Sequence, residues 1–426
     1  MRHSIIAGKA VVKISKFQGR SGSTWPGHIA LITDKAFIKK IIRRNSHLKI
    51  VLVAGTNGKT TTTKALSHLL EMNGISTITN NSGANLLNGL ASILVLKSDL
   101  RGTIKEQSLI FEVDENSLPL VLSEIPTPDA VILLNLFRDQ LDRYGEVNAT
   151  SDKWIASIKK LSVKTLVVAN SDDPQIAHVA SFASKKTYFT IDNNFKKDTT
   201  LSHAVDSTTC PKCNSPLEYS VISYSHLGNY KCNNCDFANP KAKYYSFQTH
   251  LLGTYNIYNL TSAILTADKI FGIIPFTSIE SLKTFKPAFG RQEVLEVSGK
   301  RVMLLLSKNP TGFNESLKVA IENKSSSLLI LLNDRVPDGH DISWIWDVDF
   351  ETVKDKNLKI FVSGDRAYDM ANRLLFAGVT HEVFESIETA YDQSLKKTPI
   401  GKTLTILPTY SAMLEIRKLI SGKSIL

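Results

Sequence analysis

The sequence predicts an α/β protein in which two units each contain a parallel sheet with crossover helices. Three observations lead to this fold class. Short apolar segments of strand length alternate with helical patterns, first between residues 49 and 169 and again between residues 302 and 407. Two cysteine pairs interrupt the first series, and a linker at residues 286–291 separates it from the second. The chain contains no internal repeat and no low-complexity segment.

The first unit opens with a buried strand at residues 49–53, a glycine-containing turn and a helix at residues 59–72 that ends before Gly74. A helical pattern resumes near Asn256, after the cysteine pairs. The remaining predicted strands are short apolar runs with helical patterns between them. They lie at residues 108–113, 130–134 and 165–169 in the first unit and at residues 302–306, 328–332, 359–362 and 404–407 in the second.

Length and composition exclude several classes of protein. A chain of 426 residues has room for two or three domains, and 42% hydrophobic with 21% charged residues excludes global disorder. The apolar runs are far shorter than the roughly 20 residues that cross a bilayer. Lys9, Lys13 and Lys16 interrupt any apolar core of a secretory signal. We therefore expect a cytoplasmic protein without a transmembrane helix.

The positive charge of the chain is concentrated at its N-terminus. The formal net charge is +11, and residues 1–50 contain 11 basic residues and one acidic residue, a surplus of ten charges. Lys9, Lys13, Lys16 and Arg20 are spaced to share one face of a helix. Such a face suits anionic lipid headgroups at the membrane surface. The alternatives are a solvated face of a helix docked on its own domain and, less favoured, a nucleic-acid contact.

The segment Gly55-Thr56-Asn57-Gly58-Lys59-Thr60-Thr61 predicts a phosphate-binding loop, because it joins a strand to a helix. Backbone N–H groups at the start of the helix attract phosphates, Lys59 reaches the β- and γ-phosphates, and the Thr60 hydroxyl holds Mg²⁺. The general motif has a glycine five residues before Gly58, where this chain has Val53. The shorter form is similar to that of Mur ligases and folylpolyglutamate synthases.

Polar residues follow the next two predicted strands of the first unit. Glu112 and Asp114 close one strand, and Asn135 closes the next, followed by an acidic segment at residues 138–142. In an open α/β sheet, ligands bind beyond the carboxyl ends of the strands. Carboxylates there can hold a second Mg²⁺ or position a substrate carboxyl group. The alternative for each of them is a helix cap or a surface charge.

All four cysteines of the chain fall in one short stretch, as Cys210, Cys213, Cys232 and Cys235. Two Cys-x-x-Cys pairs separated by 18 residues predict a four-thiolate zinc ribbon. Four thiolates close the coordination sphere, so we expect a structural Zn²⁺ site, with a nucleic-acid-binding ribbon as the alternative. If all four bind metal, the chain has no free thiol nucleophile.

An acidic loop at residues 333–347 follows a strand of the second unit. It contains Pro337 and Gly339, which indicate a structured turn, and its aromatic residues suggest a contact surface. The aspartates of such a loop are often turn formers. His340 and Asp341 are adjacent in sequence, an arrangement that rarely lets two side chains face each other.

These motifs together resemble the MurT family, the Mur-ligase-like subunit of the lipid II isoglutaminyl synthase, over nearly the whole chain. The zinc ribbon and the segment at residues 338–350 are specific to this family among Mur-type ligases. The other segments that carry the resemblance are GTNGKTT at 55–61, FEVDE at 111–115, NLFRDQLDRYGE at 135–146, LGTYNIYNL at 252–260, FGRQE at 289–293 and KNPTG at 308–312.

The resemblance implies a Mur-ligase-like ATPase domain with an inserted zinc ribbon, followed by a Rossmann-like α/β domain. It implies ATP-dependent amidation of the D-glutamate α-carboxyl of the lipid II stem peptide to D-isoglutamine, through an acyl phosphate. A GatD-like glutaminase, bound as a heterodimer, would supply the ammonia, and no nucleic acid would be bound. The implied domains are a basic segment at 1–46, an ATPase domain at 47–285 with the ribbon at about 206–242, and a partner-docking domain at 286–426.

The resemblance also assigns roles to single residues. It implies that Lys59 and Thr60 bind the ATP phosphates and Mg²⁺, and that Glu112 is the second magnesium ligand. Asp341 matches the family aspartate that completes the Cys-His pair of the partner, where a carboxylate would orient the imidazole. Lys59, Glu112 and Asp341 are therefore the expected catalytic residues. The remaining positions expected to contact ATP are Gly55, Thr56, Asn57, Gly58, Thr61, Asn256, Asn259 and Arg291.

Three departures from true Mur ligases bear on the expected chemistry. Gln140 replaces a histidine, so magnesium coordination can differ, and the carbamoylated lysine has no clean counterpart, Lys153 being offset. Residues 305–308 replace a motif that helps bind the incoming amino acid, a loss that suits ammonia. Two rival functions stay open: an amino-acid-adding Mur or folylpolyglutamate-type ligase, and a zinc-ribbon NTPase that acts on nucleic acid.

Overall fold

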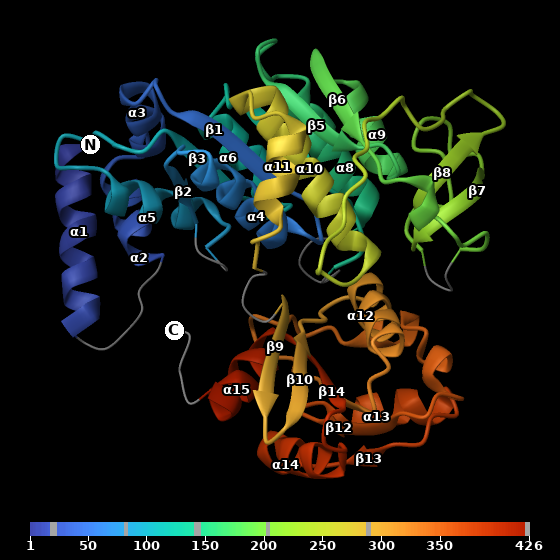
Figure 1. Cartoon of the computed structure of the whole chain (residues 1–426). Helices are drawn as coiled ribbons and strands as arrows, with labels where there is room; N and C mark the ends of the chain where they lie inside the picture. Colours follow the sequence, from blue (N-terminus) through green and yellow to red (C-terminus); the bar gives the residue numbers. More distant parts are fainter. Residues whose placement is uncertain (18–23, 81–83, 140–145, 202–204, 287–290, 422–426) are drawn as a thin grey trace.

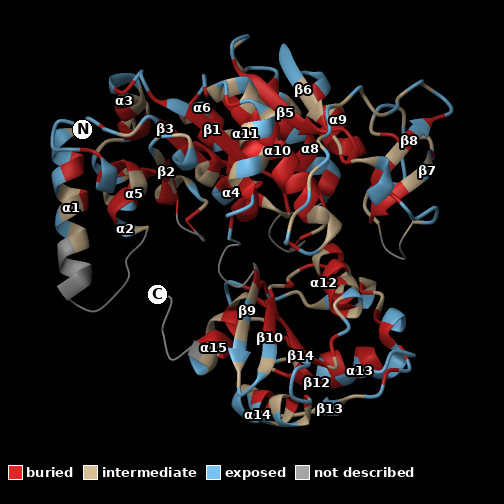
Figure 2. Cartoon of the chain, viewed as in Figure 1, coloured by how far each residue is buried: buried red, intermediate tan, exposed pale blue. Residues whose placement is uncertain are grey.

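The computed structural model describes residues 1–17, 24–80, 84–139, 146–201, 205–286 and 291–421, with the side chains of 13–17, 291 and 421 excluded. Two six-stranded sheets lie one above the other, and a two-stranded ribbon projects from one side of the upper half (Figure 1). The central strands of both sheets are buried, whereas the edge strands and the outer surfaces of the covering helices are partly exposed (Figure 2). The predicted α/β fold class is confirmed.

The first sheet has the order β2-β3-β1-β4-β5-β6, and all its described strand pairs are parallel. Its strands are apolar runs that send alternate side chains to opposite faces. Leu52 of β1 therefore enters one core, whereas Val51 and Val53 enter the other. The strands are β1 (Lys49–Ala54), β2 (Thr77–Thr79), β3 (Ser108–Glu112), β4 (Ala130–Leu133), β5 (Leu166–Asn170) and β6 (Lys185–Phe189).

Helices cover both faces of the first sheet and close one core on each side. On one side lie α1 (Arg2–Phe17), α2 (Trp25–Thr33), α3 (Phe37–Arg44), α5 (Leu87–Lys97), α6 (Leu118–Glu124), α8 (Val147–Ile158) and α9 (Pro174–Ser181). On the other side lie α4 (Lys59–Met72), α10 (Thr254–Phe271) and α11 (Pro275–Leu282).

The N-terminal helix α1 docks on the first unit. Ile5 of α1 is fully buried, and the Lys9 ammonium donates to the Ser98 carbonyl at 2.5 Å. Lys9 is thus directed toward its own domain, whereas the side chains of Lys13 and Lys16, and all of Arg20, lie outside the described residues. Within the described part of the chain, no helix is both long and apolar enough to span a bilayer.

Between β6 and α10 the chain forms the ribbon, with the 3-10 turn η1 (Asn193–Phe195) before it. Its strands β7 (Leu217–Tyr224) and β8 (Leu227–Cys232) pair antiparallel. The tip of this hairpin turns inward, and His226 in the turn is fully buried. The ribbon is therefore packed against the first unit at its inner end.

The second sheet has the order β13-β12-β11-β14-β10-β9. β9 pairs antiparallel with β10 across a tight turn in which Ser298 and Gly299 both have positive φ, and the other described pairs are parallel. The strands are β9 (Arg291–Val297), β10 (Lys300–Leu305), β11 (Ser327–Leu331), β12 (Lys359–Ser363), β13 (Glu382–Val383) and β14 (Thr403–Pro408). The helices are α12 (Pro310–Glu322), η2 (Ser343–Asp347), η3 (Phe350–Val353), α13 (Ala367–Phe376), α14 (Ile387–Lys397) and α15 (Tyr410–Ser421).

Candidate functional site

The predicted phosphate loop lies at the carboxyl end of β1, between β3 and β4. The chain runs from β1 to the β2–β3 side of the sheet and then returns to β4 on the other side, so β1 marks the point where the strand order reverses. Ligands of open α/β sheets bind at such a point. The loop then enters α4 directly, which places the N–H groups of the first helical turn at its edge.

Two glycines give the loop its conformation. Gly55 and Gly58 have φ values of 144° and 91°, which other residues rarely adopt. A Cβ at Gly58 would lie 2.1 Å from the Asn259 Oδ1 atom, so the start of α10 rests against this glycine. Asn135 fixes the loop, since its Oδ1 accepts from the Asn57 N–H at 2.8 Å and its Nδ2 donates to the Asn57 carbonyl at 3.1 Å.

Two side chains at the start of α4, which are expected to bind phosphate and Mg²⁺, are held by carboxylates. The Lys59 ammonium donates to the Gly55 carbonyl at 2.5 Å and pairs with the Glu115 carboxylate at 3.1 Å. The Thr60 hydroxyl donates to Glu112 Oε2 at 2.6 Å. All these side chains are buried, so the lysine charge is compensated within the protein. The structure thus brings Lys59, Thr60 and Glu112 together and adds Glu115.

A second lysine reaches the same edge from the C-terminal unit. Lys308 forms an ion pair with Asp139, whose carboxyl group is almost fully buried. Burial raises the pKa of Asp139, while the charge of Lys308 acts in the opposite direction. The second oxygen of Asp139, Oδ1, has no hydrogen-bond partner among the described residues. Lys308 therefore introduces a positive charge from the second unit beside the phosphate loop.

An amide pair joins the phosphate loop to α12. Asn309 Nδ2 donates to Asn57 Oδ1 at 3.0 Å, and Asn57 Nδ2 lies 3.4 Å from Asn309 Oδ1. Asn309 is also the N-cap of α12, because its Oδ1 accepts from the Gly312 N–H at 2.8 Å. The first turn of α12 is thus tied to the loop at residues 55–61.

The other expected nucleotide contacts lie at the start of α10 or beside it. Asn256 and Asn259 are buried, and Asn256 Nδ2 donates to the Leu252 carbonyl at 2.7 Å. Gln292, the residue after Arg291 in β9, accepts from the Leu252 N–H at 2.8 Å. The start of β9 is thus bonded to the segment just before α10. The side chain of Arg291 and the whole of Gln140 lie outside the described residues.

The oxygen donors at this edge suit a hard cation. The Thr60 hydroxyl and the carboxylates of Glu112 and Asp139 are the ligand types that Mg²⁺ takes together with water and phosphate. The bare Asp139 Oδ1 is a buried acceptor that lacks a protein donor among the described residues. Lys153 has a different setting, since it is exposed and its Nζ lies 3.4 Å from Asn116 Oδ1.

The four cysteines form a compact cluster. Their sulfur atoms all lie within 4.8 Å of one another, with Cys210 and Cys235 at 3.6 Å and Cys213 and Cys232 at 3.5 Å. A tetrahedral Zn²⁺ with bonds of about 2.3 Å needs sulfur separations of about 3.8 Å. Each pair is followed by a residue with positive φ, Asn214 at 61° and Asp236 at 56°, so the two halves turn alike. The cluster is compatible with zinc.

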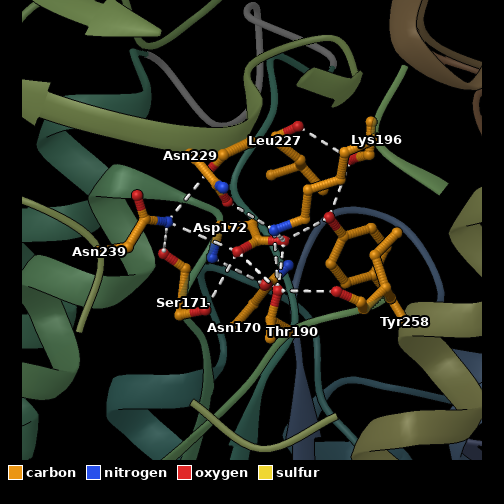
Figure 3. A network of polar contacts seen from close by, with 12 residues as sticks. Asn170, Ser171, Asp172, Thr190, Lys196, Leu227, Asn229, Asn239 and Tyr258 are labelled. Carbon is orange, nitrogen blue, oxygen red and sulfur yellow. Dashed lines mark hydrogen bonds and ion pairs between the residues drawn. The ribbon is translucent and has the colours of Figure 1, made fainter. Parts of the chain in front are cut away.

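A buried polar network anchors the ribbon to the first sheet (Figure 3). Asp172, just after β5, pairs with Lys196 at 2.8 Å and accepts from Tyr258 of α10 at 2.6 Å. Lys196 also donates to Asn229 of β8 at 2.7 Å, and Thr190 donates to the same Asp172 carboxylate. This network was not predicted, because its members lie in four separate stretches of the chain.

The acidic loop of the second unit separates into an anchored and an exposed part. The buried Asp338 carboxylate accepts from the Ser411 N–H at 2.8 Å and from the Ser411 hydroxyl. Asp341 is partly exposed and accepts from the Ser343 N–H at 2.8 Å, a local turn contact. His340 is exposed. The loop is therefore fixed at its base and presents Asp341 at its surface.

Sequence reasoning missed Glu115, Lys308 and Asn309 as site residues. Glu115 stands three positions after Glu112, and Lys308 and Asn309 follow a strand and precede Pro310, a residue favoured in the first helical turn. Their positions after predicted strands could have identified these residues in part, since residues that follow parallel strands lie at one edge of a sheet.

Comparison with known proteins places the chain among cell-wall ligases. The family model for the Mur ligase middle domain matches residues 53–267, and that for the MurT ligase C-terminal region matches residues 306–413. Among solved structures, a pseudomurein peptide ligase type C from Methanothermus fervidus aligns with a TM-score of 0.68 at 18% identity, covering 90% of this chain and 81% of that one. MurF from Thermotoga maritima, solved with ADP, aligns with a TM-score of 0.65 at 14% identity, covering 92% and 85%.

Two curated relatives match over almost the full length. The lipid II isoglutaminyl synthase (glutamine-hydrolyzing) subunit MurT of Staphylococcus aureus strain COL is 31% identical, with 96% of this chain and 95% of that protein covered. The subunit of the same name from Streptococcus pneumoniae strain R6 is 32% identical, with 99% and 97% covered. The expected enzyme class, an ATP-dependent ligase, is thereby confirmed. The chain belongs to the MurT family of Mur-type ligases.

Proposed function

We propose that this protein amidates the α-carboxyl group of D-glutamate in the lipid II stem peptide to D-isoglutamine, with ATP and with ammonia from a glutaminase partner. The MurT relatives are named for lipid II and for glutamine hydrolysis. The observation that carries the proposal is the convergence of both units on the phosphate loop. At this edge Lys59 pairs with the buried Glu115, and Thr60 bonds to the buried Glu112. Lys308 of the second unit is partly buried and pairs with the buried Asp139.

In the first step, a carboxylate oxygen of the substrate attacks the γ-phosphorus of ATP. The bond between the γ-phosphorus and the bridging oxygen breaks, which gives ADP and an acyl phosphate. Lys59 would change its ion-pair partner from Glu115 to the phosphates when ATP binds, because a buried ammonium pairs preferentially with the group of highest negative charge. Mg²⁺, held by Thr60 and Glu112, would supply charge neutralisation. Asn57 and Asn135 hold the loop in place during this exchange.

In the second step, ammonia attacks the acyl carbon, and the bond from that carbon to the phosphate oxygen breaks. The amide loses one proton, and orthophosphate leaves with one oxygen of the original carboxyl group. Lys308 lies beside the loop, paired with Asp139, where its charge would stabilise the developing phosphate. A pocket for an amino-acid side chain is not needed by ammonia, in keeping with the replaced motif at residues 305–308.

The ammonia would come from a partner, because glutamine hydrolysis in such enzymes uses a cysteine nucleophile. All four cysteines of this chain lie in the metal-type cluster. We propose that the partner docks on the 286–426 domain and that Asp341 completes its Cys-His pair. Trp346, five residues after Asp341, and Phe376 support this placement. Their ring centroids lie 5.4 Å apart, and the two residues are 45% and 72% exposed.

We further propose that the ribbon at about 206–242 holds a structural Zn²⁺, and that residues 47–285 form the ATPase domain. Gly55, Thr56, Gly58 and Thr61 belong to the loop that would bind ATP, and Asn256, Asn259 and Arg291 are the further contacts that we propose. The cytoplasmic face of the membrane is the expected location, because the surplus of basic residues at 1–46 suits anionic headgroups.

Oxygen-18 tracing tests the reaction. The purified chain is incubated with ATP, Mg²⁺, ammonium and a lipid II whose D-glutamate carboxyl oxygens are labelled. We expect amidated product and one labelled oxygen in each orthophosphate released. Amide formation with unlabelled orthophosphate would overturn the acyl phosphate. ATP turnover driven by a free amino acid, or by DNA or RNA with a steep salt dependence, would instead favour one of the two rival functions.

A further inference from the structure

Arg138 occupies a junction between the phosphate loop, the ribbon and the acidic loop of the second unit. Its Nε donates to Asp206 Oδ1 at 2.5 Å, and its backbone N–H donates to Asp206 Oδ2 at 3.0 Å. Its Nη1 pairs with Asp347 Oδ2 at 3.2 Å. The side chain of Asp206 is buried, whereas those of Arg138 and Asp347 are each about one-third exposed. One guanidinium thus joins three segments that are far apart in the sequence.

Both chain neighbours of Arg138 are bonded to groups expected to contact ATP or its phosphates. The Phe137 N–H donates to the Thr56 hydroxyl at 3.0 Å, and that hydroxyl donates to the Phe137 carbonyl at 3.2 Å. Asp139, on the other side, pairs with Lys308. The backbone that carries Arg138 is therefore bonded to the phosphate loop on one side and, through Asp139, to Lys308 on the other.

On its other side, Arg138 holds the segment that presents Asp341. Asp347 ends η2, six residues after Asp341. The segment is also packed on α12, because Asn314 Nδ2 donates to Asp349 Oδ2 at 3.0 Å and the Asp349 N–H donates to Asn314 Oδ1 at 2.9 Å. The first turn of α12 is in turn bonded to Asn57. The segment at residues 338–349 is thus connected to the phosphate loop by two routes, of which Arg138 is the direct one.

We propose that Arg138, through Asp347, is the positioning residue that couples nucleotide binding at residues 55–61 to the position of the Asp341 segment. The ribbon residue Asp206 fixes one side of the guanidinium, so that movement of the loop is transmitted to Asp347. Arginine suits this role because its planar fork serves two carboxylates at once, whereas a lysine serves as a point charge. The inference rests on the proposed function, since it requires ATP to bind at this loop.

Hydrogen–deuterium exchange on the full chain tests the coupling, with and without Mg²⁺ and a non-hydrolysable ATP analogue. In the wild type we expect the analogue to slow exchange at least fivefold in residues 55–63 and also in 338–349. Asp347→Asn should keep the protection of 55–63 and lose that of 338–349. Asp347→Glu, which retains the carboxylate, should keep both, as should Asp355→Asn, which removes an exposed charge nearby.

The outcomes separate the coupling from the proposed function. Suppose that the analogue protects residues 55–63, and that the exchange of residues 338–349 is the same in the wild type and in Asp347→Asn. This result would overturn the coupling but would leave ATP binding at the loop supported. Absence of protection at 55–63 in the wild type would overturn both. In the complex with the glutaminase partner, Asp347→Asn should reduce ATP-stimulated glutamine hydrolysis about tenfold and leave ammonium-driven amidation unchanged. An equal loss of the ammonium-driven reaction would contradict a positioning role.

Discussion

The carboxyl edges of the two sheets carry similar residues in opposite settings. At the first edge, Lys59 and Glu115 form an ion pair with less than a tenth of either side chain exposed. At the second edge, Arg335 pairs with Asp365 and Glu415, and these side chains are more than one-third exposed. The first edge lies between the two units, whereas the second lines an open hollow of about 820 Å³ on the C-terminal unit.

The difference indicates what each edge can bind. Charges that are removed from water interact strongly, and an unpaired buried charge is costly. A buried lysine that is paired with a carboxylate therefore favours a small anionic ligand that can take the place of that carboxylate. Exposed pairs are screened and each contributes little, about 1 kcal/mol or less. An exposed edge with aromatic residues beside it is instead suited to a macromolecular partner.

The largest expected effect is that of Lys59→Ala at the buried edge. Loss of this ammonium should reduce ATP-dependent amide formation by about a thousandfold, with either ammonium or glutamine as donor, because a buried charge at the phosphates stabilises the transition state strongly. The exposed Lys153→Ala is the matched control and should change the rate less than twofold. Steady-state release of ADP measures both. A comparable loss in Lys153→Ala would show that an exposed lysine is part of the chemistry.

The sequence predicts those features of this edge that depend on residues close together along the chain. The helix at residues 59–72 was predicted with the bounds that the structure has, because the motif and the apolar spacing are both local. Glu115 meets Lys59 across 56 positions, and Lys308 meets Asp139 across 169, so only the folded sheets bring them together.

The missed strands have a different cause. β6 is an edge strand that begins with two exposed lysines, so it lacks the continuous apolar run of a central parallel strand. β9 is also at an edge and was not predicted, since the predicted linker at residues 286–291 reaches only its first residue. Ser298 and Gly299 after it are nevertheless typical of a hairpin turn. Strands that are buried on both faces were predicted, whereas half-exposed edge strands were not.

The second prediction concerns two aspartates of the exposed edge. Asp341→Asn should reduce glutamine-driven amidation in the complex by about a hundredfold or more, since a carboxylate that orients a catalytic imidazole contributes up to about 10⁴ in other triads. Ammonium-driven amidation should be unchanged, because the partner is not needed. Parallel rate measurements with the two nitrogen donors check this, and equal losses would contradict the assigned role.

Asp338→Asn is the contrasting variant in the same loop. This carboxylate is buried and bonded to Ser411, so its replacement should lower the free energy of unfolding by about 2 kcal/mol. Asp341→Asn should leave the melting temperature within one degree of the wild type, because its contact is a local turn bond. Thermal unfolding of both variants would separate a stabilising aspartate from a functional one.

The third prediction asks whether the ribbon supports the buried edge. Cys213→Ser should lower zinc content from one atom per chain toward zero, because three thiolates leave the coordination incomplete. The ribbon tip should loosen, since His226 packs on Phe137 with ring centroids 4.9 Å apart and Phe137 holds Thr56. We expect a melting temperature at least 5 °C lower and weaker nucleotide binding. Full zinc content in the variant would exclude the four-thiolate site.

The smallest expected effect concerns a buried carboxyl group on the C-terminal side. Burial raises the pKa of Glu315 on α12 to about 7, more than the nearby Lys318 lowers it. Between about pH 4.3, where an unfolded glutamate titrates, and pH 7, the native chain binds more protons at this site than the unfolded chain. The free energy of unfolding therefore falls as the pH rises through this interval.

Glu315→Gln removes the ionisable group and therefore the free-energy cost of ionising a buried carboxyl group. The variant should gain up to about 3 kcal/mol relative to the wild type at pH 8 and almost nothing at pH 4.5. Urea unfolding at the two pH values measures the difference, and the exposed Glu388→Gln should show no such dependence. A gain that is equal at both pH values would mean that the amide improves packing. In that case, burial would not hold a proton on Glu315, and the contrast between buried and exposed carboxyl groups would not extend to α12.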